Sequence, residues 1–96
     1  MAEKIYKDDY GHTFLVDAKT SLVGYTSVTL YVTKPSGTQV EWELTVDDEA
    51  EGKTSYIIEE GDLDESGRYK IYVIAILSNG IFTGNFDTFD VYERGK

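Results

Sequence analysis

Apolar and polar side chains alternate with a strict two-residue period from Ser27 to Thr33. This period places one face of an extended chain in a core and the other in water, so it predicts a β-strand. Proline and glycine then occupy the second and fourth positions of Lys34-Pro35-Ser36-Gly37, an arrangement that favours a type I turn. The period resumes from Val40 to Val46, with Trp42 on the apolar face, and ends at the acidic segment from Asp47 to Gly52. We therefore predict a β-hairpin followed by a loop.

The longest predicted strand runs from Tyr69 to Leu77 and is apolar on both faces. Alternate residues starting at Tyr69 form one face, whereas Tyr72, Ile74 and Ile76 form the other. A strand of this kind lies in the centre of a sheet. A sandwich of this size has one core, so the second apolar face must meet the segment from Asp9 to Val16, another loop or another chain. The candidate interface residues are Tyr72, Ile74, Ile76, Phe82 and Phe86.

Asn79-Gly80 follows this strand and is the strongest two-residue hairpin signal, because both positions of a type I′ turn require positive φ. The register set by this turn leaves Phe89 and Val91 on the wet face. One extra residue near Gly84-Asn85 corrects the register, so we predict a β-bulge there. The predicted pairs are Leu77 with Phe82 before the bulge, and Ile71 with Phe89 and Tyr69 with Val91 after it.

Shorter strands are predicted at Ile5–Tyr6, at Thr13–Asp17 and from Thr54 to Ile58, the first two at sheet edges. No segment of eleven or more residues shows the 3.6-residue period of a helix. The fold class is therefore all-β, an antiparallel sandwich of about seven or eight strands. Residues 1–96 form a single domain, and the absence of cysteine excludes a disulfide.

The acidic balance of the chain limits the partners that it can bind. Eighteen acidic and nine basic side chains give a formal net charge of −9, which repels phosphate backbones and anionic lipid. We therefore expect neither nucleic acid nor a membrane as partner. The N-terminal residues lack the apolar stretch of a signal peptide, and the longest apolar run, from Ile71 to Leu77, is too short to span a bilayer.

Catalytic and metal-binding signals are weak. His12 is the single histidine, and no nucleophile elbow or phosphate-binding glycine loop occurs, so we expect no enzyme and no cofactor. Asp62-x-Asp64-x-Ser66-Gly67 matches the first half of a calcium loop, but Val73 occupies the position of its bidentate glutamate. We expect these side chains to order a strand-to-strand corner instead. Whether the acidic segment from Asp47 to Glu51 binds a cation is left open.

The segment from Glu65 to Ile71 resembles the corner of immunoglobulin-like domains, in which a tyrosine, here Tyr69, follows a glycine, here Gly67, and opens the long strand. The resemblance implies that Trp42 is the core tryptophan. It also implies that Ile71 and Leu30 occupy the positions of the two disulfide cysteines of extracellular relatives. The chain is thus similar to disulfide-free immunoglobulin-like (Ig-like) β-sandwiches.

A wider resemblance covers most of the chain. The segments that carry it are Asp9-Tyr10-Gly11, Leu22 to Val28, Lys34-Pro35-Ser36-Gly37, Trp42, Gly61-Asp62-Leu63-Asp64, Gly67-Arg68-Tyr69 and Gly80 to Val91. Together they resemble small phage and prophage Ig-like proteins, which are similar to N-terminal modules of baseplate and tail-fibre proteins. This resemblance implies a structural or assembly module that docks on tail, baseplate or capsid proteins, in the virion or in the host cytoplasm during assembly. Homo-oligomerisation is open, and the alternative is a carbohydrate-binding or cell-surface-binding module using Tyr25, Tyr31 and loop acids.

Overall fold

A computed structural model of the chain describes residues 5–84 and 86–93, and within them it contains β-strands and no helix. Nine strands are present in the described residues. In chain order they are β1 (Ile5–Tyr6), β2 (Thr13–Asp17), β3 (Tyr25–Thr33), β4 (Gln39–Glu43), β5 (Thr45–Asp48), β6 (Lys53–Ile57), β7 (Gly67–Leu77), β8 (Gly80–Thr83) and β9 (Asp87–Tyr92).

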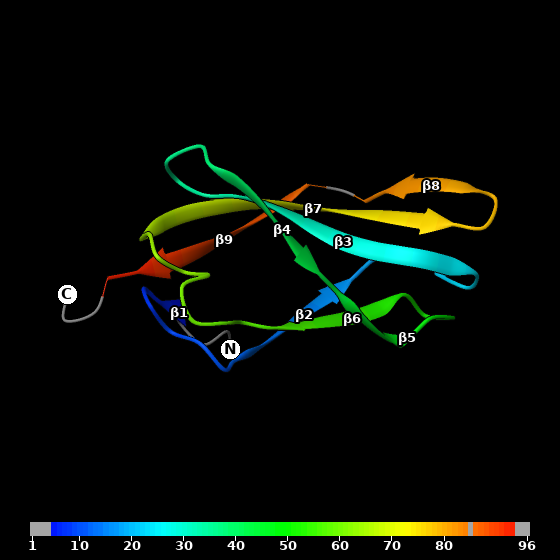
Figure 1. The fold of residues 1–96 in the computed structure, drawn as a ribbon, viewed down its shortest axis with the longest axis horizontal. Coiled ribbons are helices and arrows are strands. Elements are labelled where there is room, and N and C mark those ends of the chain that lie inside the picture. The colour runs from blue at the N-terminus through cyan, green and yellow to red at the C-terminus, as the bar shows by residue number, and fades with distance from the viewer. Residues whose placement is uncertain (1–4, 85, 94–96) are drawn as a thin grey trace.

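The strands form two sheets that lie in separate layers (Figure 1). The large sheet has the order β1-β9-β7-β3-β4, and β8 also pairs with β7. The small sheet has the order β2-β6-β5. All pairs are antiparallel except β1 with β9, which are parallel. The prediction of an all-β fold is confirmed, as are the central position of β7 and the edge positions of β1 and β2.

The core lies between the two sheets and is filled by the inward side chains of the alternating strands. Val28, Leu30 and Val32 of β3 are buried, as the two-residue period predicts. Trp42 is buried at the centre, stacks on Tyr56 of the small sheet with ring centroids 4.7 Å apart, and meets Phe14 edge-on at 6.1 Å. Side chains from both layers therefore share one apolar cluster, which is the main source of folding free energy in a domain of this size.

The predicted hairpin around Lys34-Pro35-Ser36-Gly37 is confirmed. The amide of Gly37 donates to the carbonyl oxygen of Lys34 at 2.8 Å, and Gly37 adopts a φ of +97°. Gln39 then faces Thr33, and the ladder continues to Glu43 opposite Thr29.

The prediction of one continuous strand from Val40 to Val46 was wrong. The chain leaves the large sheet at Leu44, whose amide still donates to Val28 at 3.0 Å, and enters the small sheet, where Thr45 faces Ser55. The two-residue period continues across this change of sheet because the core lies between the sheets. Alternate residues therefore point into the core both before and after Leu44. The strand also continues to Asp48, one residue beyond the expected start of the acidic loop at Asp47.

The hairpin after β7 turns one residue earlier than Asn79-Gly80 indicates, which moves the partner of Leu77 by two residues. Leu77 faces Gly80 rather than Phe82, so Ser78-Asn79 forms the turn, and neither residue has positive φ. The predicted later pairs were also wrong: Phe89 faces Tyr69, and Val91 faces Gly67. The displacement is an even number of residues, so Phe89 and Val91 still point into the core as expected.

An extra residue does separate β8 from β9. Ile74 faces Thr83 and Ile71 faces Asp87, so between these two pairs the returning chain has one residue more than β7. This irregularity lies at the predicted bulge position, although Asn85 itself is outside the described residues.

Leu30 and Ile71 do not lie opposite each other across the core. β3 and β7 are neighbours in the large sheet, where Leu30 faces Val73 and Val32 faces Ile71. The resemblance implied a cross-sheet pair at these positions, and the sheet topology contradicts it. Both side chains are nevertheless buried.

The predicted corner before β7 is held by side-chain hydrogen bonds. The hydroxyl of Tyr69 donates to the carbonyl oxygen of Glu65 at 2.7 Å, and the amide of Glu65 donates back to that hydroxyl at 3.2 Å. Asp62 accepts from the Tyr56 hydroxyl at 2.7 Å and from the Glu59 amide at 2.8 Å. Gly67, at a φ of +128°, lies against Pro35, so a Cβ there would approach the proline ring to 2.9 Å. The corner thus joins β6 to β7 and contacts the β3–β4 turn.

Burial raises the pKa of Tyr69 to about 12, the Glu65 amide lowers it, and the carboxylates of Asp64 and Glu65 raise it. An unfolded tyrosine ionises near pH 10, so from about pH 10 to 12 the unfolded state loses this proton first and stability falls by up to about 1.4 kcal/mol per pH unit. The contribution is fully present below pH 10. Replacing Tyr69 by phenylalanine should cost about 1–2 kcal/mol at neutral pH and flatten this alkaline fall. Urea unfolding followed by circular dichroism across that pH range measures both, and an unchanged alkaline slope would contradict the assignment.

Candidate interaction surface

The outer face of the large sheet, opposite the core, carries a contiguous set of apolar side chains. Strand β7 positions them, because Ile71, Val73 and Ala75 point into the core and the residues between them point away. Neighbouring strands add to the row. We call this set the outer-face patch: Tyr31, Tyr72, Ile74, Ile76, Ile81 and Phe86.

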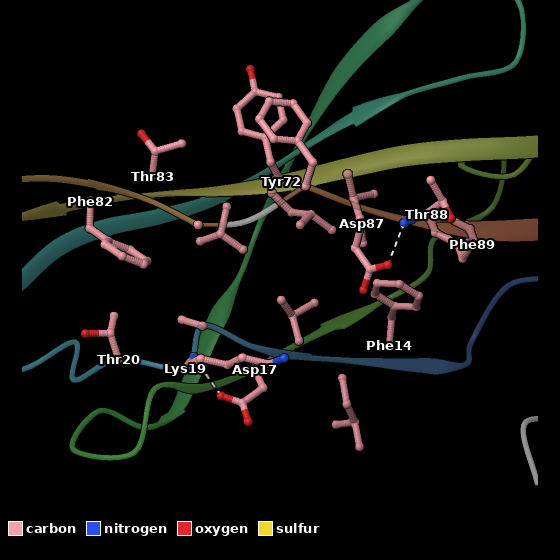
Figure 2. Close-up of a pocket in the computed structure, with 18 residues that line it drawn as sticks. Phe14, Asp17, Lys19, Thr20, Tyr72, Phe82, Thr83, Asp87, Thr88 and Phe89 are labelled. Atoms are coloured by element: carbon pink, nitrogen blue, oxygen red, sulfur yellow. Dashed lines mark hydrogen bonds between the residues drawn. The ribbon is translucent and has the colours of Figure 1, made fainter.

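The strand register brings these side chains together. Tyr31 of β3 faces Tyr72 of β7, and their rings stack at 5.2 Å with an interplanar angle of 9°. Phe86 lies 4.7 Å from Tyr72 on its other side, at an angle of 32°. Ile76 faces Ile81 of β8 directly. Figure 2 shows the Tyr72 ring on the side of the large sheet that faces away from β2.

Three side chains of the patch are exposed to solvent. Tyr72 and Ile74 are half-buried by their neighbours, but Ile76 is 42% exposed, Ile81 70% and Phe86 72%. Scattered exposed apolar residues are ordinary, whereas an adjoining row on one sheet face is typical of an interaction surface.

Four of the five sequence-predicted interface residues lie on this face. Phe82 does not: it faces the buried Ala75, points inward and packs against the core. Tyr31 and Ile81 complete the patch, but the sequence reasoning about interfaces omitted both. The alternation of β3 already placed Tyr31 on the outer side, and the predicted pair of Leu77 with Phe82 already placed Ile81 there. Its direct pairing with Ile76, however, depends on the true turn at Ser78-Asn79.

The segment from Asp9 to Val16 does not cover the patch. Thr13–Asp17 forms β2 in the small sheet, and Phe14 points into the core against Trp42 and Phe89. The alternative in which this segment seals the second apolar face is therefore wrong.

Acidic side chains border the patch on the β4 side. Glu41 faces Tyr31 and Glu43 faces Thr29, and both glutamates are exposed. On the β9 side, Arg68 pairs with Asp90 at 3.0 Å, which neutralises both charges locally. The rim is thus acidic on the β4 side, and on the β9 side it carries the Arg68–Asp90 ion pair and the exposed Lys70.

A groove opens between the edge strand β2 and the junction of β8 with β9, with a volume of about 760 Å³ (Figure 2). Phe14 points up from β2, and Phe82 and Asp87 point down from the large sheet into this space. Residues 14–20 form one wall, and Gly84 and Phe89 lie in the opposite wall. Groove and patch meet at Phe86 and Tyr72, which belong to both.

The acids of the half calcium loop are engaged within the protein. Asp64 accepts from the Lys34 ammonium at 2.8 Å, and this hydrogen bond lowers the pKa of its carboxyl. Burial, followed by the hydrogen bond to Asp62, raises the pKa of the Tyr56 hydroxyl well above its usual value. In residues 5–84 and 86–93, no three His, Cys, Asp or Glu side chains are gathered so as to hold a metal ion.

The remaining single candidates lie apart. Asp48 accepts from the amide of Glu51 at 3.2 Å, which orders the acidic turn after β5. His12 lies 3.6 Å from the carboxylate of Asp9 and is exposed. Tyr25 faces Leu77, six residues along β3 from Tyr31, so these two tyrosines do not share a binding site. Over the described part of the chain, no helix is long and apolar enough to cross a bilayer.

No protein-family model matches the sequence, and no curated protein is significantly similar to it.

Proposed function

We propose that this chain is a non-catalytic assembly module, an Ig-like β-sandwich that docks on other proteins through the outer-face patch. The observation that carries this proposal is the row of adjoining apolar side chains on the sheet face opposite the core. A folded domain that leaves such a row open gains free energy when a partner covers it.

Strand order and the corner support the Ig-like assignment. The order β9-β7-β3-β4 facing β2-β6-β5 fits strands G-F-C-C′ facing B-E-D of variable-type Ig domains. Tyr69, near the start of β7, bonds back to Glu65 as the corner tyrosine does at the start of strand F. In this correspondence Trp42 lies on C′ rather than C, one strand away from the usual core tryptophan.

The resemblance to phage and prophage Ig-like proteins supports a place in a virion. The partners are then tail, baseplate or capsid proteins, and the chain acts in the particle or in the bacterial cytoplasm during assembly. The acidic rim at Glu41 and Glu43, with the net charge of −9, favours a partner whose flat apolar surface has a basic border.

A second candidate function is glycan binding on the same face. The aromatic row of Tyr31, Tyr72 and Phe86 next to Glu41 favours it, because sugars stack on rings and hydrogen-bond to carboxylates. Tyr72 lies between Tyr31 and Phe86, and Tyr31 is half-buried, so the 72%-exposed Phe86 offers the most open ring for stacking.

Replacing both Ile76 and Ile81 by serine should weaken assembly about tenfold or more while leaving the circular dichroism spectrum unchanged. Ile76 is 42% exposed and Ile81 is 70% exposed, and neither belongs to the buried core between the sheets, so folding depends less on them than on core residues. Ile57→Ser is the matched control, because Ile57 is 63% exposed but lies on the small sheet. Sedimentation of the chain, alone and with co-expressed virion proteins, measures the effect.

Four outcomes decide between the candidates. Loss of co-sedimentation with virion proteins in the double variant supports docking on a partner, and loss of a self-associated species supports a homo-oligomer. Saturable binding on a glycan array, lost on Phe86→Ser, supports the second candidate. A strict monomer with no partner and no glycan would remove both proposals.

A further inference from the structure

Within residues 5–84 and 86–93, β2 pairs with β6 on one side and has no strand on the other, so it presents free backbone groups to the groove. The amide of Ile58 donates to His12 at 2.9 Å and the amide of Ala18 donates to Gly52 at 2.9 Å, in one continuous register with the β2–β6 ladder. In an antiparallel ladder the bonding residues alternate, so the even-numbered residues of β2 bond to β6. The N–H and C=O groups of Thr13, Leu15 and Asp17 therefore point away from β6, toward the open edge.

This edge lacks the usual protection against an added strand. Edge strands are commonly guarded by charged side chains, and β4 and β5 carry Glu41, Glu43, Asp47 and Asp48. In contrast, the sequence of β2 is Thr-Phe-Leu-Val-Asp, with Leu15 78% exposed and the charge only at its end. β2 is thus a template of about 17 Å for another extended chain.

The groove has the position and the volume for the inward side chains of such a chain. A strand beside β2 would extend the small sheet and place every second side chain between the layers. There it would meet Phe14, Phe82 and Phe89, in a space whose volume of about 760 Å³ lies in the range of ligand sites. The intervening side chains would lie beside Leu15 on the outer face of the small sheet.

We propose that an extended peptide segment of a protein partner adds as a strand to β2, with alternate apolar side chains inserted into the groove and basic residues at its ends. The backbone of β2 selects an extended chain, and the aromatic walls select apolar inward side chains. Asp87 points into the groove, and although Lys19 also lines it, the net charge of −9 favours a cationic partner over a second copy of this chain. The edge of β2 lies in the small sheet, whereas the outer-face patch lies on the large sheet, and the two surfaces meet at Tyr72 and Phe86.

Backbone amide exchange in the ¹⁵N-labelled full chain tests the proposal residue by residue. The probes are synthetic peptides of about eight residues, lysine-flanked, in which threonine alternates with valine, isoleucine, leucine or phenylalanine. Binding should slow exchange of the Thr13, Leu15 and Asp17 amides about tenfold or more, because these gain hydrogen bonds, and leave Phe14 unchanged. Methylating the peptide nitrogens in one alternate frame should abolish the effect, whereas methylation in the other frame should not.

Two variants test separately the backbone pairing with β2 and the insertion of side chains into the groove. Leu15→Pro removes an N–H that points away from β6, so the β2–β6 ladder keeps its bonds while peptide pairing is lost. Gly84→Leu leaves β2 intact and fills the groove, since a Cβ at Gly84 makes only ordinary contacts, 3.5 Å from Val73. Each should weaken peptide binding about tenfold or more. Val23→Ser is the control and should bind peptide normally, because Val23 is 59% exposed and lies outside both the groove and the outer-face patch.

Three results would overturn the proposal. One is the absence of slowing with every peptide at millimolar concentration, and another is equal binding of peptides methylated in either frame. The third is slowing that grows with protein concentration in the absence of peptide, which would make a second copy the occupant. None of these results bears on the outer-face patch, whose test is the isoleucine pair.

Discussion

Replacing Gly52 by alanine is expected to lower the free energy of unfolding by about 3–4 kcal/mol. Gly52 is buried at a φ of +74°, and a methyl group there would overlap the carbonyl oxygen of Thr20. The left-handed backbone alone costs an alanine about 1–2 kcal/mol. The overlap accounts for the rest of the loss, because the Thr20 carbonyl is a backbone group and cannot rotate away as a side chain could. Relieving the overlap would require the turn after β2 to move. Chemical denaturation at neutral pH measures the loss.

Gly61→Ala is the matched control for this substitution. Gly61 has a φ of +91°, but nothing lies within 4 Å of the position of its Cβ. It should therefore cost only the conformational part, about 1–2 kcal/mol. Equal losses in the two variants would show that the close approach of Gly52 to Thr20 is unimportant.

The Gly52 contact matters beyond stability because it fixes the end of β2. The carbonyl oxygen of Gly52 accepts from the amide of Ala18, and the carbonyl oxygen of Glu49 accepts from Leu22 at 2.6 Å. These bonds hold residues 18–22 on the small sheet, and residues 18–20 line the groove. In Gly52→Ala, local opening of this segment should speed amide exchange at Ala18 more than at residues around Trp42.

Side-chain direction could be predicted from the sequence far better than strand pairing. The two-residue period placed Val28, Leu30, Trp42 and Val73 in the core correctly, because burial is the strongest force on a pleated chain. It could not show that the chain changes sheet at Leu44, because the period is the same in both layers.

Long-range contacts overrode the local turn signal at Asn79-Gly80. The amide of Ser78 donates to the carbonyl oxygen of Gly24 at 3.0 Å, and Tyr25 faces Leu77. The start of β3 therefore holds the end of β7 and moves the turn to Ser78-Asn79. No local sequence pattern contains this contact, so the direct pairing of Ile76 with Ile81 could not be predicted.

The outer-face patch could be predicted from the sequence, whereas the groove beside β2 could not. The apolar second face of β7 is visible in the sequence, since Tyr72, Ile74 and Ile76 alternate with core residues. The groove is not, because it requires that the edge of β2 in one sheet lie beside the β8–β9 junction of the other. A site formed between layers depends on tertiary placement that periodicity does not encode.

Replacing Trp42 by alanine should cost about 3–5 kcal/mol, whereas replacing Tyr31 by alanine should cost about 1 kcal/mol. The two residues lie on neighbouring strands and each stacks on a tyrosine, Trp42 at 4.7 Å and Tyr31 at 5.2 Å. They differ in the face they occupy: Trp42 is 3% exposed in the core, and Tyr31 is half-buried on the outer face. Unfolding by urea, followed by circular dichroism because the first variant lacks tryptophan, compares them.

The comparison also tests what the outer face is for. If Tyr31→Ala costs as much as Trp42→Ala, the aromatic row acts as a second core that stabilises the isolated chain, and the docking proposal loses its physical basis. A small cost, together with weaker assembly, means that these rings contribute free energy mainly when a partner covers them. Burial of these rings would then contribute to the free energy of binding rather than to the free energy of folding, as is expected of a surface that stays exposed until assembly.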